Sequence, residues 1–160
     1  MIVESERFGT MDLKENKIFE FPAGIPGFED LRKFVILEIE QTKPIYWMQS
    51  TENKYIALPV INPFEIIEDY YVVIKDTEVT ELNIENENDL MIMNVLVIPS
   101  DINKMTANLA APIIINARTG IGKQIFIDAA ELPIRFPVYE SIMTALKGGK
   151  ASAGAVQESR

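Results

Sequence analysis

The chain has 160 residues, of which 48% are hydrophobic, and it carries a formal net charge of −9. This length and apolar content favour a single globular domain with a hydrophobic core and exclude an intrinsically disordered chain. Because the sequence holds no histidine and no cysteine, it excludes Ser-His-Asp and Cys-His nucleophiles and zinc sites built from imidazole or thiolate ligands.

Short β-rich segments separated by turns begin the chain. Residues 18–21 follow a polar stretch and alternate in character, as the return strand of a hairpin does. Pro26 and Gly27 suit the two central positions of a type II turn. Residues 34–39 form the next β-rich run.

A hairpin is predicted next. Residues 46–50 and 55–61 are β-rich and flank a four-residue polar loop. Pro59 has no N–H group, so we expect the second strand to lie at a sheet edge or to carry a bulge there. Trp47 lies in an apolar strand and is expected in the core.

The middle of the chain combines apolar and acidic residues. Residues 64–69 are compatible with one helical turn, and residues 70–74 predict a strand whose alternate side chains face opposite sides. Residues 76–89 are polar and acidic. Residues 90–98 are almost continuously apolar and predict a long strand covered on both faces.

A third hairpin and a helix end the predicted domain. Residues 113–117 and 124–127 flank a glycine-bearing loop, and residues 138–146 show helical apolar spacing. The sequence therefore predicts an all-β fold, a short-stranded antiparallel pseudo-barrel or sandwich with a short C-terminal helix. Residues 1–146 form the single domain of this prediction, and residues 147–160 a flexible tail.

Acidic residues concentrate in one block. Between positions 55 and 103 there are ten acidic residues and a single base, Lys75. Such a field repels phosphate and attracts basic partners, so we expect a basic protein partner and no direct nucleic-acid binding. No apolar run has the roughly 20 residues that a membrane-spanning helix needs, and the N-terminus is acidic. We expect a cytoplasmic protein without membrane contact.

Four blocks of the sequence resemble the FliW family, the bacterial flagellar assembly factors. They are residues 21–29, residues 46–50, residues 58–64 running on to Asp69 and Tyr70, and residues 105–116 with 122–124. They occur in family order between residues 3 and about 138. The sequence departs from the family pattern at Asn62-Pro63, where Asp-Pro is frequent, and at residues 130–132, where tyrosine is common.

The resemblance implies a regulator that exchanges partners and is not an enzyme. FliW-like proteins bind CsrA, a small RNA-binding dimer that represses translation of flagellin mRNA, and they also bind flagellin. Their antagonism of CsrA is described as allosteric, or noncompetitive. The resemblance also implies a β pseudo-barrel, and neither it nor the residues imply a cofactor or a metal. We expect a monomer, because no exposed heptad or long apolar stripe favours self-assembly.

The acidic block also contains the candidate partner-binding residues. Apolar anchors inside an acidic rim would supply specificity that charge alone cannot. The apolar candidates are Phe64, Ile66, Ile67, Tyr70, Tyr71 and Val73, and the charged ones are Glu65, Glu68, Asp69, Lys75, Asp76 and Glu78. Asn108 has either a turn-forming or a contact role, and the sequence leaves both open.

Two other functions stay open as alternatives. A generic acidic flagellin chaperone would bind many unfolded clients weakly. A small carboxylate-based hydrolase would need an enclosed pocket with a paired carboxyl group of raised pKa.

Overall fold

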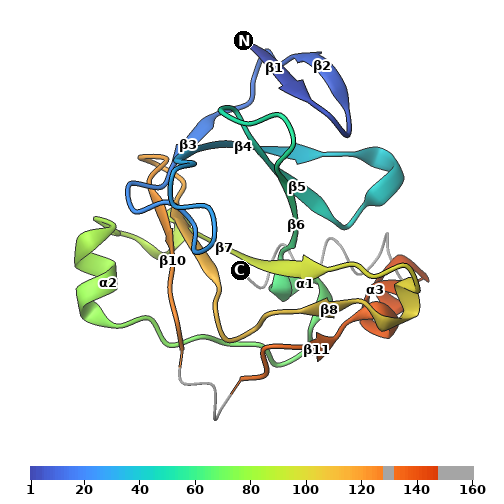
Figure 1. The fold of residues 1–160 in the computed structure, drawn as a ribbon. Coiled ribbons are helices and arrows are strands. Elements are labelled where there is room, and N and C mark those ends of the chain that lie inside the picture. The colour runs from blue at the N-terminus through green and yellow to red at the C-terminus, as the bar shows by residue number, and fades with distance from the viewer. Residues whose placement is uncertain (128–131, 148–160) are drawn as a thin grey trace.

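An antiparallel β-sheet forms the body of the molecule in the computed structural model, which describes residues 1–127 and 132–147 (Figure 1). Its strands are β3 (Ile18–Glu20), β4 (Lys33–Glu38), β5 (Tyr46–Ser50), β6 (Ala57–Ile61), β7 (Leu90–Val97), β8 (Thr106–Ala107), β9 (Ile113–Asn116), β10 (Gly122–Gln124) and β11 (Phe136–Pro137). The main path runs β10-β9-β7-β6-β5-β4-β3, and β8 joins β11 to β7. The predicted all-β fold is confirmed.

The two ends of this path meet, so the sheet curls into a pseudo-barrel. Glu20, at the end of β3, forms a parallel bridge with Ile121 beside β10, and its N–H donates to the Gly120 carbonyl at 2.8 Å. Gly122 allows this closure: a Cβ there would lie 2.8 Å from the Phe21 ring. Fully buried side chains that include Phe34 fill the interior, where apolar burial stabilises the fold.

A second small sheet covers one end of the barrel. It consists of β1 (Ile2–Ser5) and β2 (Gly9–Asp12), which pair as an antiparallel hairpin at the top of Figure 1. Val3 is buried against Trp47, and the ring of Phe8 meets that indole edge to face at 5.4 Å. Trp47 is 5% exposed, which confirms its predicted place in the core. The hairpin itself was absent from the sequence prediction.

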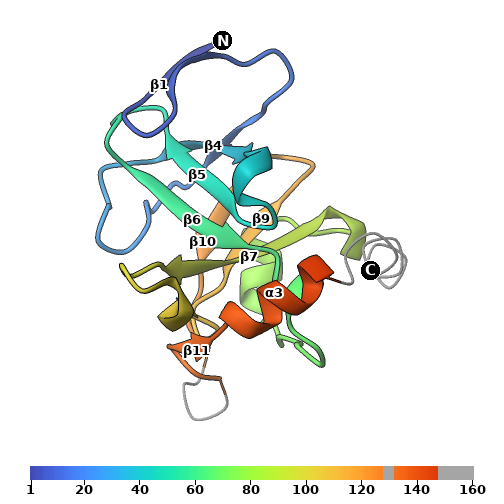
Figure 2. The same cartoon turned by 90° about the vertical axis from the view of Figure 1, so that its right-hand side faces the viewer.

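Helices lie on the outside of the sheet. They are α1 (Pro63–Ile66), α2 (Asp76–Glu81) and α3 (Tyr139–Lys147), with 3-10 turns η1 (Glu40–Thr42), η2 (Glu87–Asp89) and η3 (Ile102–Lys104). Figure 2 shows α3 below β7, and α3 packs against α1 and η3. Val138 and Ile142 anchor it to Met105 and Leu96 in one apolar cluster. The predicted C-terminal helix is therefore confirmed, and it includes Lys147.

The predicted hairpins are largely confirmed. β5 pairs with β6, and β9 pairs with β10. The second strand of the latter hairpin is Gly122–Gln124, which shares only Gln124 with the predicted range 124–127, and residues 125–127 belong to no strand. The prediction of an edge position for β6 is wrong, because β6 lies between β5 and β7. Pro59 is nonetheless tolerated, since β7 pairs only with Val60 and Ile61 of this strand. Residues 18–21 pair with the following β4 and not with the segment before them.

The predicted strand at residues 70–74 is wrong: this segment belongs to no strand. Its predicted alternation nevertheless exists, because Tyr70 is buried whereas Tyr71 and Val73 are each 74% exposed. Residues 148–160, which hold the predicted tail, lie outside the described residues. No helix in the described part of the chain is long and apolar enough to cross a membrane.

Candidate partner-binding groove

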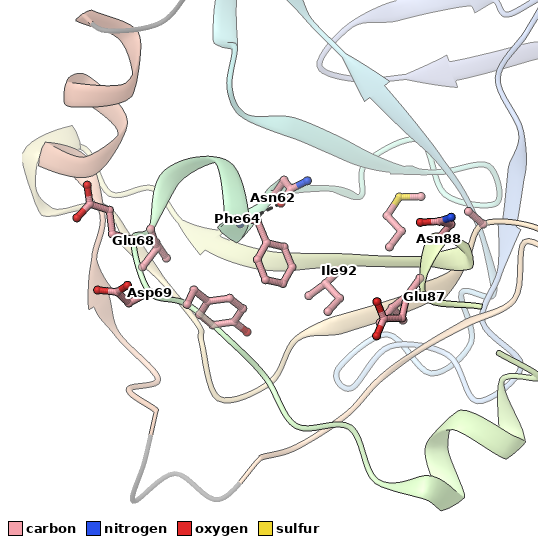
Figure 3. Close-up of a pocket in the computed structure, with 12 residues that line it drawn as sticks. Asn62, Phe64, Glu68, Asp69, Glu87, Asn88 and Ile92 are labelled. Carbon is pink, nitrogen blue, oxygen red and sulfur yellow. Dashed lines mark hydrogen bonds between the residues drawn. The ribbon is translucent and has the colours of Figure 1, made fainter. Parts of the chain in front are cut away.

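A large hollow on the described surface is lined mainly by residues of the acidic block. It is a groove of about 940 Å³ lined by Asn62, Phe64, Ile67, Glu68, Asp69, Tyr70, Glu87, Asn88, Leu90, Met91, Ile92 and Ala117. We call it the acidic groove. Figure 3 shows Glu68 and Asp69 toward one end and Glu87 with Asn88 toward the other, with Phe64 and Ile92 between them.

The start of α1 fixes one wall of the acidic groove. Asn62 caps the helix, because its Oδ1 accepts a hydrogen bond from the Phe64 N–H at 3.0 Å, and Pro63 occupies the first turn. The ring of Phe64 then meets the ring of Tyr70 edge to face at 5.4 Å. Together with Ile92 of β7, these residues give the groove an apolar floor.

The rim of the acidic groove carries uncompensated negative charge. Glu68, Asp69 and Glu87 form no ion pair with any described residue. Bases from outside the block do neutralise other members of it: Arg118 pairs with Glu85 and Asp89, and Lys123 pairs with Glu78 and Glu81. The acidic groove therefore keeps three carboxylates that no described base offsets.

Lys123 of β10 holds α2 against the sheet. Its Nζ lies 2.8 Å from Glu78 Oε2 and donates to Glu81 Oε2 at 3.0 Å. Glu78 and then Glu81 raise the pKa of the Lys123 ammonium group above its ordinary value, because both carboxylates favour the charged form. Glu78 is thus occupied inside the protein.

A buried hydroxyl group lies beneath the acidic groove. Tyr70 is 9% exposed, and its Oη forms no hydrogen bond with any described residue. Asn94 Oδ1 is also buried without a hydrogen bond to a described residue. The Nδ2 of the same side chain donates to the Asn108 carbonyl at 2.8 Å. Burial raises the pKa of the Tyr70 hydroxyl, and the nearby Asn94 side chain partly offsets this rise.

The structure brings together five of the candidate binding residues: the acidic groove is lined by Phe64, Ile67, Glu68, Asp69 and Tyr70. Ile66 is buried in the core instead. Tyr71 and Val73 border a smaller hollow of about 140 Å³, which also contacts Asp69 and Tyr70. These two hollows share one wall. Their common edge is the segment that the sequence predicted as a strand.

The other candidates lie elsewhere. Lys75 and Asp76 stand at the start of α2, Glu78 is paired with Lys123, and Glu65 is half-buried within α1. Asn108 has the turn-forming role: its Oδ1 accepts from the Ala110 N–H at 3.1 Å. None of these residues lines the groove.

Sequence reasoning missed the second wall of the groove. Glu87 and Asn88 of η2 and Met91 of β7 line it, opposite α1. Glu87 could have been found from its place in the acidic block. The approach of residues 87–92 to α1 depends on the pairing of β7 with β6, which no local pattern encodes.

Comparison with known proteins decides the family. A model of the FliW family, described as "FliW protein", matches residues 2–138. The chain belongs to the FliW family. The flagellar assembly factor FliW of Caldicellulosiruptor bescii is 41% identical over 141 residues, covering 88% of this chain and 92% of that protein. The FliW of Clostridium tetani is 37% identical, covering 88% of this chain and 97% of that protein.

A solved structure agrees with this assignment. The crystal structure of a flagellar assembly factor FliW superimposes with a TM-score of 0.79 and 27% identity, covering 87% of this chain and 97% of that one. The curated relatives that match this chain are flagellar assembly factors. Membership therefore gives this chain a role in flagellar assembly, with protein partners.

Proposed function

We propose that this chain is a non-enzymatic regulator that binds CsrA and flagellin in exchange. Capture of CsrA relieves its repression of flagellin mRNA translation by an allosteric, noncompetitive route, and flagellin competes for the regulator. The observation that carries the proposal is the acidic groove, whose apolar floor lies inside a rim of unpaired carboxylates.

The charge of the rim suits an RNA-binding partner. A protein surface that binds RNA is rich in Lys and Arg, so it is drawn to the field of Glu68, Asp69 and Glu87. The same carboxylates repel phosphate. Once CsrA is bound, they hold negative charge near its RNA-binding surface and disfavour RNA without overlapping it.

The floor of the groove supports selectivity. Charge alone attracts any cationic surface, whereas binding energy concentrates in buried aromatic and aliphatic contacts. Phe64 and Ile92 supply such a surface between the two acidic ends (Figure 3). A partner therefore needs both basic and apolar side chains to fill the site.

A titration with competition tests the proposal. Purified protein is titrated with CsrA by calorimetry, and the complex is then challenged with flagellin. We expect saturable, stoichiometric binding of CsrA that flagellin reverses. Weak binding of many unfolded clients would favour the generic chaperone instead, and no binding of CsrA at any ionic strength would refute the proposal.

A further inference from the structure

Residues 68–74 begin with a turn and continue as a backbone that the described protein leaves open. Glu68 and Asp69 form the turn, in which Asp69 has a φ of 57°. After it, the N–H groups of residues 71–74 and the carbonyl groups of residues 70–74 form no hydrogen bond with any part of 1–127 or 132–147. By contrast, β9 is hydrogen-bonded on both edges, to β7 and to β10. An extended chain with unpaired polar groups is the usual template for an added strand.

The side chains of this segment already alternate as those of a strand do. Val72 and Ile74 are half-buried and pack against the cluster of Leu82, Ile92, Ile114 and Ile125. Tyr71 and Val73 point away from that cluster and are each 74% exposed. The inner residues thus fix the segment to the protein, and the outer pair leaves an apolar surface for a partner.

A hollow lies on each side of the segment. The acidic groove lies on one side, and the smaller hollow that contains Ile127 and Leu132 lies on the other. Tyr70 lines both hollows, is about nine-tenths buried, and has a hydroxyl group without a full hydrogen bond. Successive side chains of an added strand point to opposite faces, so two hollows could receive alternate residues.

The negative charge around the segment favours a basic binding partner. Glu68 and Asp69 have no ion pair with described residues, and both lie within the segment itself. Glu87 adds a third carboxylate across the groove. A segment with Lys or Arg beside apolar residues matches this surface, whereas an acidic strand would be repelled.

We propose that residues 70–74, the open part of this segment, receive a basic, extended segment of the RNA-binding partner as an added β-strand. This inference rests on the proposed function and names its recognition mode: backbone hydrogen bonds along the segment, basic residues at the rim, and apolar residues against Tyr71 and Val73. The partner thus completes an edge that the regulator alone leaves unpaired.

Residue-resolved amide hydrogen exchange by NMR tests the inference on the unmodified protein, free and bound to CsrA. In the free protein we expect fast exchange from Tyr71 to Ile74. In the complex we expect every second amide in this segment to exchange at least about tenfold more slowly, since an added strand binds alternate N–H groups. Backbone-to-backbone Overhauser contacts with CsrA should accompany this protection.

The amides of β9, protected in both states, serve as the internal reference. Binding of CsrA with uniform or absent protection of residues 71–74 would overturn the strand addition and leave the proposed function standing. Protection by flagellin but not by CsrA would also overturn it. Failure of CsrA to bind at all would refute both the strand addition and the proposed function, and the calorimetric titration identifies that case.

Discussion

Asn116 joins two elements through one buried side chain. Its Nδ2 donates to the carbonyl groups of Leu82 and Asn83 at 2.9 and 3.1 Å, and its Oδ1 accepts from the N–H groups of Arg118 and Thr119 at 2.9 and 3.2 Å. The side chain is fully buried, and its bond to the Leu82 carbonyl is buried as well, whereas the other three bonds are partly buried. The end of α2 and the β9–β10 turn therefore depend on one amide.

We expect Asn116→Ala to lower the free energy of unfolding by about 3 kcal/mol, because it leaves several buried polar groups unpaired. Chemical denaturation measures this value. Asn88→Ala is the matched control: Asn88 is exposed, and its substitution should change stability by less than about 0.5 kcal/mol. Equal losses for the two variants would contradict the bridging role of Asn116.

Substitutions of Tyr71 and Val73 test partner binding without a large change in stability. Both side chains are 74% exposed, so Tyr71→Ala and Val73→Ala should change the free energy of unfolding by less than about 0.5 kcal/mol. If the two side chains are anchors, each substitution should weaken CsrA binding about tenfold in calorimetry. Tyr55→Ala, at a tyrosine that is 67% exposed outside the groove, should leave the affinity unchanged. Equal affinities for all three variants would remove Tyr71 and Val73 from the interface.

At the scale of elements, Lys123 connects β10 to α2 and gives the stability a pH dependence. Folding raises the pKa of this ammonium group above its ordinary value of 10.5. Its stabilising contribution is therefore complete below pH 10.5 and disappears as the pH rises through the folded-state pKa. The pairs are partly exposed, so we expect a contribution of about 1 kcal/mol.

The comparison of wild type with Lys123→Met isolates this contribution. Denaturation curves at pH 8 should show the variant less stable by about 1 kcal/mol. Above pH 10.5 the difference should shrink toward zero, because the wild-type ammonium group loses its proton. Lys17→Met is the control, since that ammonium group donates only to carbonyls of Ala117 and Arg118. A difference that stays constant through this range would contradict the linkage.

The elements differ in how well the sequence predicts them. The β5–β6 and β9–β10 hairpins have turn residues between β-rich runs, so local pattern sufficed. Residues 70–74 have the same pattern but no strand beside them, and pairing is a property of the tertiary structure. The α2 helix was missed because its single large apolar residue, Val79, gives no helical period.

The two walls of the acidic groove also differ in how well the sequence predicts them. Phe64, Glu68, Asp69 and Tyr70 are close in sequence, so the acidic block and the family resemblance identified that wall. The opposite wall at residues 87–92 reaches the groove only because β7 pairs with β6 at Val60 and Ile61. Likewise, the meeting of Glu20 with Ile121 that closes the barrel joins residues about a hundred positions apart, which no periodicity reveals.

Over the whole molecule, internal ion pairs redistribute the charge that the sequence places in one block. Arg118 and Lys123 pair with four of its acidic residues on the α2 side and offset two of their four negative charges, and the groove keeps its carboxylates unpaired. Glu78 therefore matters less for attracting a partner than its sequence position indicates. The long-range field depends on the rim, which directs the final prediction to Glu68, Asp69 and Glu87.

We expect the triple variant Glu68→Gln, Asp69→Asn and Glu87→Gln to slow association with CsrA about fivefold or more at low salt, with a much smaller effect at high salt. Asparagine tolerates the positive φ of 57° at Asp69, so the backbone is preserved. The control variant removes three carboxylates around the β1–β2 end, Glu4→Gln, Glu6→Gln and Glu15→Gln. Stopped-flow measurement of the association rate of both variants separates the effect of the rim from that of total charge. Equal slowing of the two variants would assign the attraction to net charge. No slowing of the rim variant would exclude the rim as the source of the attraction.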